Sequence, residues 1–354
     1  MIIHSRLKDY TVHIEENLDF LLNLPKENVQ FVIDRKVYDL YEKYFDSVPK
    51  DRLILLDATE ENKILDTALA ICEKMTEIPA KRNMQLISVG GGITQDLTGF
   101  VANILYRGIK WIFVPTTLLA ACDSCIGGKT SLNYKKYKNL LGTFYPPDEI
   151  HICARFFDTL SEGDYKSGLG EVVKFNIMEG EDGLKKMENN IASLLTREKE
   201  KINQFVLSSL TYKKKFIEAD EFDRGERIKL NFAHTFGHAV EVVSNYAIPH
   251  GTAVAMGMIM ADGLSCKRGL LDEEMITRSE KILLQIIDID STVLDVDMEH
   301  FIKAVRKDKK QTDSAMTAVL RTKQDLTIVK DMTEEEVIYA VQYFKDLYQR
   351  KHLC

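Results

Sequence analysis

Histidines cluster in one short stretch of this sequence. Three of the eight lie between residues 234 and 250, as His234, His238 and His250. On a helix, residues four apart share one face, so His234 and His238 point into the same space, and His250 can close on them from the start of the next element. Three protein ligands with one open coordination position are typical of a catalytic metal site. A single buried histidine is more often a core residue, but three together predict a metal or catalytic centre.

A carboxylate is expected to complete this centre, and Glu171 is the best candidate. It lies in the run 168–174, which is otherwise apolar and predicted to be helical. An ionised Glu in such a segment is costly unless it is paired or bound to a metal. Lys174 shares the same helix face three residues later, so an exposed Glu–Lys pair is the alternative interpretation.

A glycine-rich turn forms the second candidate site. The strand-like run 85–89 ends in three consecutive glycines, Gly90 to Gly92, and a helix with Asp96 in its first turn is expected to follow. Such a turn lets the backbone approach a phosphate closely, and the helix N-terminus offers free N–H groups. A second predicted strand ends nearby in Thr116 and Thr117, whose hydroxyls can reach a ribose or phosphate. The pattern favours a dinucleotide site, although a structural turn and a helix-start carboxylate remain alternatives.

Two different architectures must position these residues. In the first half, short apolar runs at 29–33, 53–56, 85–89 and 111–114 alternate with helical patterns at 38–45, 60–75, 97–106 and 118–121. From about residue 161, long amphipathic stretches dominate, at 184–195, 201–219, 230–246, 252–268 and 334–348. A chain of 354 residues also exceeds the usual size of a single core. We therefore predict a Rossmann-like α/β domain with a parallel sheet (1–155), followed by a mostly α-helical domain (156–354).

Composition excludes several classes of protein. The formal net charge of −7 argues against nucleic acid as a partner, so cations that bind a phosphorylated substrate must cluster locally. The absence of a signal-like N-terminus and of a long apolar run predicts no secretion and no membrane span, and hence a cytoplasmic protein. Six scattered cysteines suit reduced thiols. Cys122 and Cys125 form a C-x-x-C without a second pair, and we interpret them as small buried residues rather than as a redox or metal site.

An ordered series of motifs, covering essentially the whole chain, resembles the 3-dehydroquinate synthase family of sugar phosphate cyclases. Each motif alone is common, but the order and spacing together are specific. The motifs are Gly90-Gly91-Gly92 with Asp96, Tyr106-Arg107-Gly108, Pro115-Thr116-Thr117-Leu118-Leu119-Ala120, Asp123-Ser124 with Gly127-Gly128-Lys129-Thr130, Lys138-Asn139, Gly170-Glu171-Val172-Val173-Lys174, Leu230-Asn231 with His234-Thr235-Phe236-Gly237-His238, and His250-Gly251.

The resemblance implies an NAD- and metal-dependent phosphate lyase that converts 3-deoxy-D-arabino-heptulosonate 7-phosphate to 3-dehydroquinate, in the shikimate pathway of aromatic amino acid biosynthesis. It also implies a homodimer. In the family, oxidation of a secondary alcohol acidifies the adjacent C–H and allows phosphate to leave, and reduction, ring opening and aldol closure follow.

The family's functional residues carry over position by position. The metal, zinc or cobalt, is held by residues matching Glu171, His234 and His250, which leaves His238 near the substrate and corrects the spacing argument. Other positions matching substrate contacts are Asp123, Lys129, Lys174, Lys213, Arg227 and Asn231, with Arg107, Lys138 and Asn139 near the phosphate and Lys309 or Lys310 as a further contact. The positions matching NAD contacts are Asp34, Glu60, Lys63, Gly91, Gly92, Asp96, Thr116 and Thr117, and Lys129 and Lys138 also belong to this set.

Several positions depart from the family pattern and leave the substrate open. They are Ile93-Thr94-Gln95, Ser131-Leu132, Asp223, Ala233 and Thr252. Retention of Arg227, Asn231 and His238 favours the carboxylated substrate, while a paralogue making a valiolone- or inosose-type product is the main alternative. A metal-dependent alcohol dehydrogenase and an NAD-binding regulator are further alternatives, and Lys213, inside a run of three lysines, is also compatible with a solvated surface.

Overall fold

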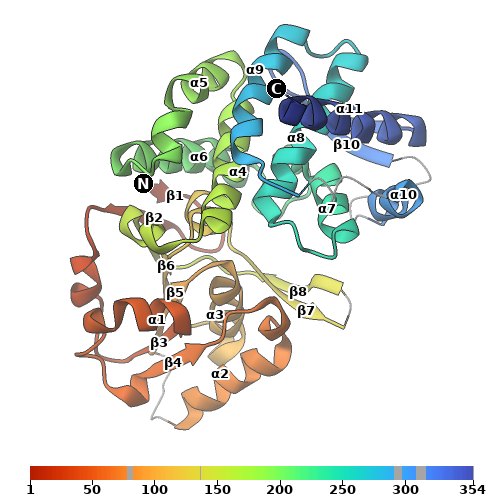
Figure 1. Cartoon of the computed structure of the whole chain (residues 1–354). Coiled ribbons are helices and arrows are strands. Elements are labelled where there is room, and N and C mark those ends of the chain that lie inside the picture. Colours follow the sequence, from red (N-terminus) through yellow and green to blue (C-terminus); the bar gives the residue numbers. More distant parts are fainter. Residues whose placement is uncertain (78–82, 136, 291–296, 308–315, 354) are drawn as a thin grey trace. The chain divides into compact units, whose positions relative to one another are not determined.

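The chain forms two compact units, Met1–Leu160 and Ser161–Cys354, in a computed structural model (Figure 1). The structure describes residues 1–77, 83–135, 137–290, 297–307 and 316–353. The first unit contains a mainly parallel sheet with helices, and the second is mostly helical. The predicted fold class is therefore confirmed.

A seven-stranded sheet forms the core of the first unit, in the order β1-β2-β9-β6-β5-β3-β4. All neighbouring pairs are parallel except β1 and β2. The central strands are apolar along their whole length because a parallel sheet is covered on both faces. The strands are β1 (Ile2–Ile3), β2 (Tyr10–Glu15), β3 (Val29–Asp34), β4 (Leu53–Leu56), β5 (Gln85–Gly90), β6 (Lys110–Pro115) and β9 (Glu149–Cys153).

The strand order reverses between β3 and β5. Strand β4 pairs with one side of β3, whereas β5 pairs with the other side and β6 continues in that direction. In open parallel sheets, ligands bind outside the carboxyl ends of the strands at such a reversal. Asp34 ends β3, and Gly90, the first of the three glycines, ends β5, so both flank this point.

Helices pack against the central strands, and a hairpin packs against two helices of this unit. Helix α3 packs against β5 and β6, α1 against β3 and β4, and both α2 and α3 contact the antiparallel hairpin β7–β8 (Figure 1). These elements are α1 (Arg35–Tyr41), α2 (Leu65–Glu77), α3 (Gly92–Ile104), β7 (Lys129–Tyr134) and β8 (Tyr137–Phe144).

Helix α8 is the core of the second unit. It packs against α4, α7, α9, α11 and β10, and every residue from Gly251 to Ser265 is buried, which explains why its sequence is apolar on all sides (Figure 1). The elements of this unit are α4 (Glu162–Ile177), α5 (Glu181–Leu195), α6 (Lys199–Ala219), α7 (His234–Val243), α8 (His250–Lys267), α9 (Glu273–Ile286), α10 (Met298–Arg306), β10 (Met316–Arg321), β11 (Leu326–Met332) and α11 (Glu334–Leu353).

Some boundaries differ from the sequence prediction. Helix α3 begins at Gly92 rather than near residue 97, so Asp96 lies in its second turn and is not a helix-start carboxylate. The helix predicted at 230–246 begins only at His234, because the 3-10 helix Glu226–Asn231 precedes it and Ala233 adopts a left-handed conformation with φ 69°. No helix in the described part of the chain is both long enough and apolar enough to cross a membrane.

Candidate functional site

Glu171, His234 and His250 meet in the second unit. Their ligand atoms all lie within 4.8 Å of one another. Oε1 of Glu171 is 3.5 Å from Nε2 of His234 and 3.4 Å from Nε2 of His250. The structure thus brings together the three residues that the family resemblance assigned to the metal, from helices α4, α7 and α8.

The spacing of these atoms suits a shared metal ion. Four tetrahedral ligands with bonds of about 2.1 Å lie about 3.4 Å apart, which is longer than an ordinary hydrogen bond. The two measured separations match that value. Two imidazole nitrogens and one carboxylate oxygen are also the donor set of many catalytic zinc sites. The donors and their geometry therefore fit a divalent transition metal.

Glu171 lies deep in the interior beside a buried lysine. Its side chain is fully buried, and the Lys174 ammonium is 2.6 Å from its Oε2 and donates to the backbone carbonyl of Leu230 at 3.2 Å. The two carboxylate oxygens therefore have different neighbours, with the histidines on Oε1 and the lysine on Oε2. This arrangement differs from the exposed Glu–Lys pair considered from the sequence.

Two glycines allow α4 and α8 to approach closely enough to form this centre. A Cβ on Gly170 would overlap the carbonyl oxygen of Gly251, and a Cβ on Gly251 would overlap the carbonyl oxygen of Ser167. The Ser167 hydroxyl also accepts a hydrogen bond from the Gly251 N–H at 3.0 Å. Since Glu171 and His250 adjoin these glycines, the close backbone contact sets their separation.

The far nitrogen of each histidine has a partner that orients the ring. Nδ1 of His234 lies 3.0 Å from the carbonyl oxygen of Phe232, and Nδ1 of His250 lies 3.2 Å from Oε2 of Glu241. Both Nε2 atoms are thereby directed toward Glu171. Sequence reasoning missed Glu241, although its position three residues after His238 on the same helix face was a usable signal.

The two carboxylates also determine the charge of His250 in the metal-free protein. Burial lowers the pKa of His250, but the nearby carboxylates of Glu171 and Glu241 more than offset this effect and raise the pKa to about 10. A metal at this site must therefore displace a proton from His250.

His238 lies beside the centre rather than in the Glu171 group. Its ring centroid is 5.2 Å from that of His234 and 6.0 Å from that of His250. Together with Glu241 and His250 it forms a second, overlapping group of possible ligands. The i, i+4 spacing thus correctly placed His234 and His238 side by side.

Buried cations accompany this centre in the second unit. Lys174, Lys213 and Arg227 are only 2%, 7% and 4% exposed, so Lys213 is not on a solvated surface. The Arg227 backbone N–H donates to Asp220 Oδ2 at 3.2 Å, and its guanidinium donates to the carbonyl of Glu221. Asn231 is partly exposed at the end of the same 3-10 helix.

The glycine-rich turn of the first unit presents an open helix N-terminus. Gly91 is the N-cap of α3 and receives no side-chain capping hydrogen bond. A Cβ on Gly92 would meet only the Ser124 hydroxyl at ordinary contact distance, which leaves room beside the first turn. The Thr116 N–H donates to the Gly90 carbonyl at 2.9 Å, so the loops after β5 and β6 lie together. Free amides, space and a positive dipole end fit a pyrophosphate group.

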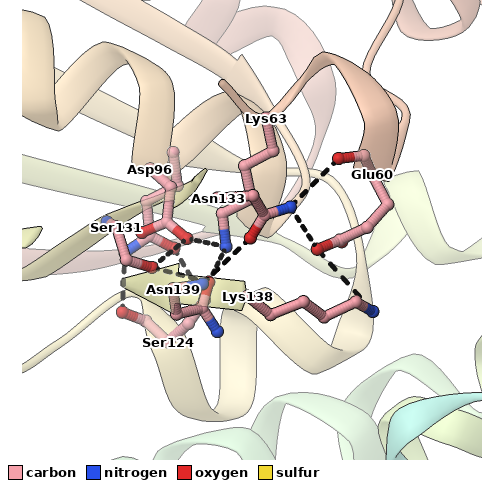
Figure 2. Close-up of polar contacts among 9 residues, drawn as sticks. Glu60, Lys63, Asp96, Ser124, Ser131, Asn133, Lys138 and Asn139 are labelled. Atoms are coloured by element: carbon pink, nitrogen blue, oxygen red, sulfur yellow. Dashed lines mark hydrogen bonds and ion pairs between the residues drawn. The ribbon is translucent and has the colours of Figure 1, made fainter. Parts of the chain in front are cut away.

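A polar network joins most of the remaining dinucleotide candidates (Figure 2). The Lys63 ammonium pairs with Asp96 at 2.5 Å and donates to Oδ1 of Asn139 at 2.6 Å. Ser131 donates to Asp96 from both its N–H and its hydroxyl. Burial raises the pKa of Asp96, although Lys63 and Ser131 act in the opposite direction. Ser131, one of the positions that depart from the family pattern, is therefore part of this network.

Glu60 contacts two further residues on the hairpin side of this network. Its carboxylate accepts a hydrogen bond from Asn133 at 2.8 Å and lies 3.7 Å from the Lys138 ammonium (Figure 2). Asn133 also accepts from the Asn139 N–H at 2.9 Å. Neither Asn133 nor Ser131 was predicted from the sequence.

The other candidates occupy separate places in the first unit. Asp34 caps α1 by accepting a hydrogen bond from the Lys36 N–H, and burial raises the pKa of its carboxyl group. Arg107 is exposed and has a positive φ of 63° in the turn after α3. Asp123 is half-buried in the π-helix Ala120–Ser124, and Lys129 is exposed at the start of β7. Lys309 and Lys310 lie outside the described residues.

Comparisons with known proteins agree with the motif series. Two family models match, described as 3-dehydroquinate synthase N-terminal (residues 53–167) and 3-dehydroquinate synthase C-terminal (residues 168–311). The chain is 36% identical over 351 residues to a 3-dehydroquinate synthase of Clostridium tetani, covering 94% of this chain and 92% of that protein.

Two solved structures have the same fold at low identity. A 2-epi-5-epi-valiolone synthase from Streptomyces hygroscopicus subsp. jinggangensis 5008, with NAD+ and Zn2+ bound, matches with a TM-score of 0.83 and 24% identity, over 98% of this chain and 99% of that one. A 2-deoxy-scyllo-inosose synthase complexed with carbaglucose-6-phosphate, NAD+ and Co2+ matches with a TM-score of 0.82 and 23% identity, over the same shares of the two chains.

Proposed function

Because the chain belongs to the 3-dehydroquinate synthase family, we propose that it converts 3-deoxy-D-arabino-heptulosonate 7-phosphate to 3-dehydroquinate and phosphate, using NAD and a divalent metal. The observation that carries this proposal is the group formed by Glu171, His234 and His250, with buried Lys174 beside it. A shikimate-pathway role and a homodimer remain predictions from the family, and a cytoplasmic location remains a prediction from the sequence.

Glu171, His234 and His250 hold the zinc or cobalt ion in this proposal. A metal bound there acts as a Lewis acid toward oxygen atoms of the substrate. Glu241 and the Phe232 carbonyl keep the two imidazoles in the orientation that directs Nε2 at the ion. His238, which lies next to the ligands, is then available to exchange a proton with the substrate.

The buried cations indicate an anionic substrate. Lys174, Lys213 and Arg227 are buried cations in the unit that holds the candidate metal centre, and ammonium and guanidinium groups bind carboxylates and phosphates through charge-assisted hydrogen bonds. Asn231 adds a neutral hydrogen-bonding group at the end of the segment that carries Arg227. A dehydrogenase for a neutral polyol has no comparable use for these cations. We assign Arg107, Lys138 and Asn139 to the substrate phosphate, and Asp123 and Lys129 to further substrate contacts.

The dinucleotide is assigned to the carboxyl ends of β3, β5 and β6. NAD supplies the hydride acceptor that oxidises a substrate alcohol and later returns the hydride. The amides at Gly91 and Gly92 bind its pyrophosphate, and Thr116 and Thr117 donate from the neighbouring loop. The other assigned contacts are Asp34, Glu60, Lys63, Asp96, Lys129 and Lys138.

Phosphate release from purified full-length protein tests the proposed reaction. The metal-stripped chain is incubated with NAD and Zn2+ or Co2+, and with the seven-carbon keto acid phosphate or, in parallel, sedoheptulose 7-phosphate. We expect phosphate and 3-dehydroquinate from the keto acid phosphate only, without accumulation of NADH. Release from sedoheptulose 7-phosphate alone identifies a cyclase of the valiolone type, and accumulation of NADH with a simple polyol identifies a dehydrogenase.

Neighbouring lysines provide a matched control for the assignment of the substrate site. Lys213 is buried, whereas Lys214, next to it on α6, is partly exposed and pairs with Glu218 at 3.6 Å. Lys213→Met is expected to raise KM or lower kcat by about tenfold or more, because a charge-assisted contact is lost. Lys214→Met is expected to leave both constants nearly unchanged. Equal effects of the two substitutions contradict a substrate role for Lys213.

A further inference from the structure

A second group of histidines and glutamates lies on the sheet of the first unit. Strands β2 and β9 are parallel neighbours, and His13 and His151 are directly paired across them. Because side chains two residues apart share one face of a strand, Glu15 and Glu149 lie on the same face as the histidines. Parallel pairing of residues far apart in the sequence therefore builds a cluster that no local motif reveals.

His151 is held between the two carboxylates. Its Nδ1 lies 2.8 Å from Oε1 of Glu15, and its Nε2 lies 3.2 Å from Oε2 of Glu149. The same oxygen of Glu149 is 4.0 Å from Nε2 of His13. The His13 and His151 rings stack with centroids 4.8 Å apart, and Phe20 stacks against His151 at 5.5 Å. The ring of His151 is thus fixed by neighbours on several sides.

The contacts repeat those of the Glu171 centre. In both clusters one carboxylate faces the Nε2 atoms of two histidines, and a second carboxylate holds Nδ1 of one of them. The pairs Glu149/Glu15 and Glu171/Glu241 therefore have matching positions. A carboxylate on the far nitrogen is a common way to orient a metal-bound imidazole.

The two ring nitrogens of His151 suit a metal ligand. Nδ1 can donate its N–H to Glu15, and Nε2 then presents its lone pair on the side of Glu149. A metal ion bound by this lone pair can also be bound by the carboxylate of Glu149. His13 supplies a further nitrogen on the open side, since the ligand atoms of His13, Glu149 and His151 all lie within 4.8 Å of one another.

We propose that His13, Glu149 and His151 bind a second divalent transition-metal ion of the zinc class, with water completing its coordination. Glu15 and Phe20 are positioning residues that orient His151. The stacked His13 ring must turn about its side-chain bonds to place Nε2 in the coordination sphere, and its 42% exposure leaves room for that rotation. Because Glu149 is also 49% exposed, binding is expected to be at least about tenfold weaker than at the buried Glu171 centre.

Metal stoichiometry of the full-length, metal-stripped protein tests the site. Equilibrium dialysis against Zn2+ is expected to give two bound ions per chain, the weaker of which is lost in His13→Ala and in Glu149→Gln. Glu171→Gln is expected to lose the tighter ion. The double variant Glu149→Gln/Glu171→Gln is expected to lose both ions. Glu77→Gln, a comparably exposed glutamate on α2, is the matched control and is expected to retain two ions.

The readout is independent of the proposed cyclase activity. Glu149→Gln changes a partly exposed side chain without changing its size, so it retains the fold even if His13→Ala does not. One ion per wild-type chain overturns the proposal, and so does a second ion that persists in both His13→Ala and Glu149→Gln. With Co2+ in place of Zn2+, the expected result is a second set of visible absorption bands that disappears in the same two variants.

Discussion

Glu241 is not one of the proposed metal ligands, but it orients the imidazole of His250, which is. It lies 3.2 Å from Nδ1 of His250. Glu241→Gln keeps the size of the side chain but removes its charge, so we expect the affinity for Zn2+ to fall about 10- to 100-fold. Competition with a chromophoric chelator measures this affinity directly. Glu226→Gln, an exposed glutamate of the same unit, serves as the control; equal losses in the two variants contradict the orienting role.

Metal affinity is also expected to depend steeply on pH. The carboxylates of Glu171 and Glu241 raise the pKa of His250 to about 10 in the metal-free protein, despite the opposing effect of burial. Because this pKa is raised, protonated His250 stabilises the metal-free fold below its ordinary pKa of about 6.5, and that contribution is lost as the pH rises toward 10. Metal binding displaces the proton, so the affinity should increase up to about tenfold per pH unit between 7 and 9. A flat affinity across this range, measured with the same chelator, contradicts proton displacement.

The sequence predicted this centre only in part, for a physical reason. Helical spacing places His234 and His238 side by side whether or not either binds a metal, so spacing cannot select between them. What separates them is the direction of each ring relative to Glu171, which depends on the packing of α4, α7 and α8. The family resemblance supplied that choice, whereas Glu241 appeared only in the three-dimensional arrangement.

At the scale of elements, the contact between α4 and α8 is expected to control the metal centre. Gly170→Ala would place a methyl group on the backbone of Gly251, and backbone atoms cannot move aside as a flexible side chain can. We expect a loss of about 1–3 kcal/mol in the free energy of unfolding, and a fall in Zn2+ affinity of at least about tenfold as Glu171 moves away from His250. Denaturant unfolding and metal competition measure the two effects.

Gly163 supplies a control on the same helix. It lies in the first turn of α4, and a Cβ there would meet no atom within 4 Å. Gly163→Ala is therefore expected to stabilise the protein by up to about 1 kcal/mol through helix propensity, with unchanged metal affinity. Unaltered metal binding in Gly170→Ala would contradict the prediction that the contact between α4 and α8 sets the spacing of the metal ligands.

Local pattern predicted elements better than it predicted their pairing. The central strands β3, β5 and β6 read as continuous apolar runs, and their positions followed from the sequence. Strands β2 and β9 were missed because His13, Glu15 and His151 interrupt their apolar pattern. These two strands are also far apart in the sequence, so no local pattern shows that they pair. The start of α3 was also predicted too late. Glycine disfavours a helix, so the sequence did not indicate that α3 begins at Gly92, directly after the turn that follows β5.

At the scale of the whole molecule, the candidate ligands of the two cofactors divide between the two compact units. Every residue assigned to NAD precedes Leu160, and every residue assigned to the metal follows Ser161. A ligand that binds only the folded state stabilises it by about 2.7 kcal/mol at a hundredfold excess over its Kd. With these assignments, each cofactor has its own binding residues, and each stabilisation can be removed separately.

Two substitutions in the full-length protein test this independence. Glu171→Gln is expected to abolish the rise in melting temperature caused by Zn2+ and to preserve the rise caused by NAD. Gly92→Ala is expected to do the reverse, because its methyl group meets only the Ser124 hydroxyl at 3.9 Å within the protein but occupies the space that a pyrophosphate needs beside the first turn of α3. Thermal unfolding of each variant with Zn2+ alone and with NAD alone gives the four shifts to be compared. Loss of the NAD shift in Glu171→Gln would contradict independent sites, and an unchanged NAD shift in Gly92→Ala would remove the glycine turn from the dinucleotide assignment.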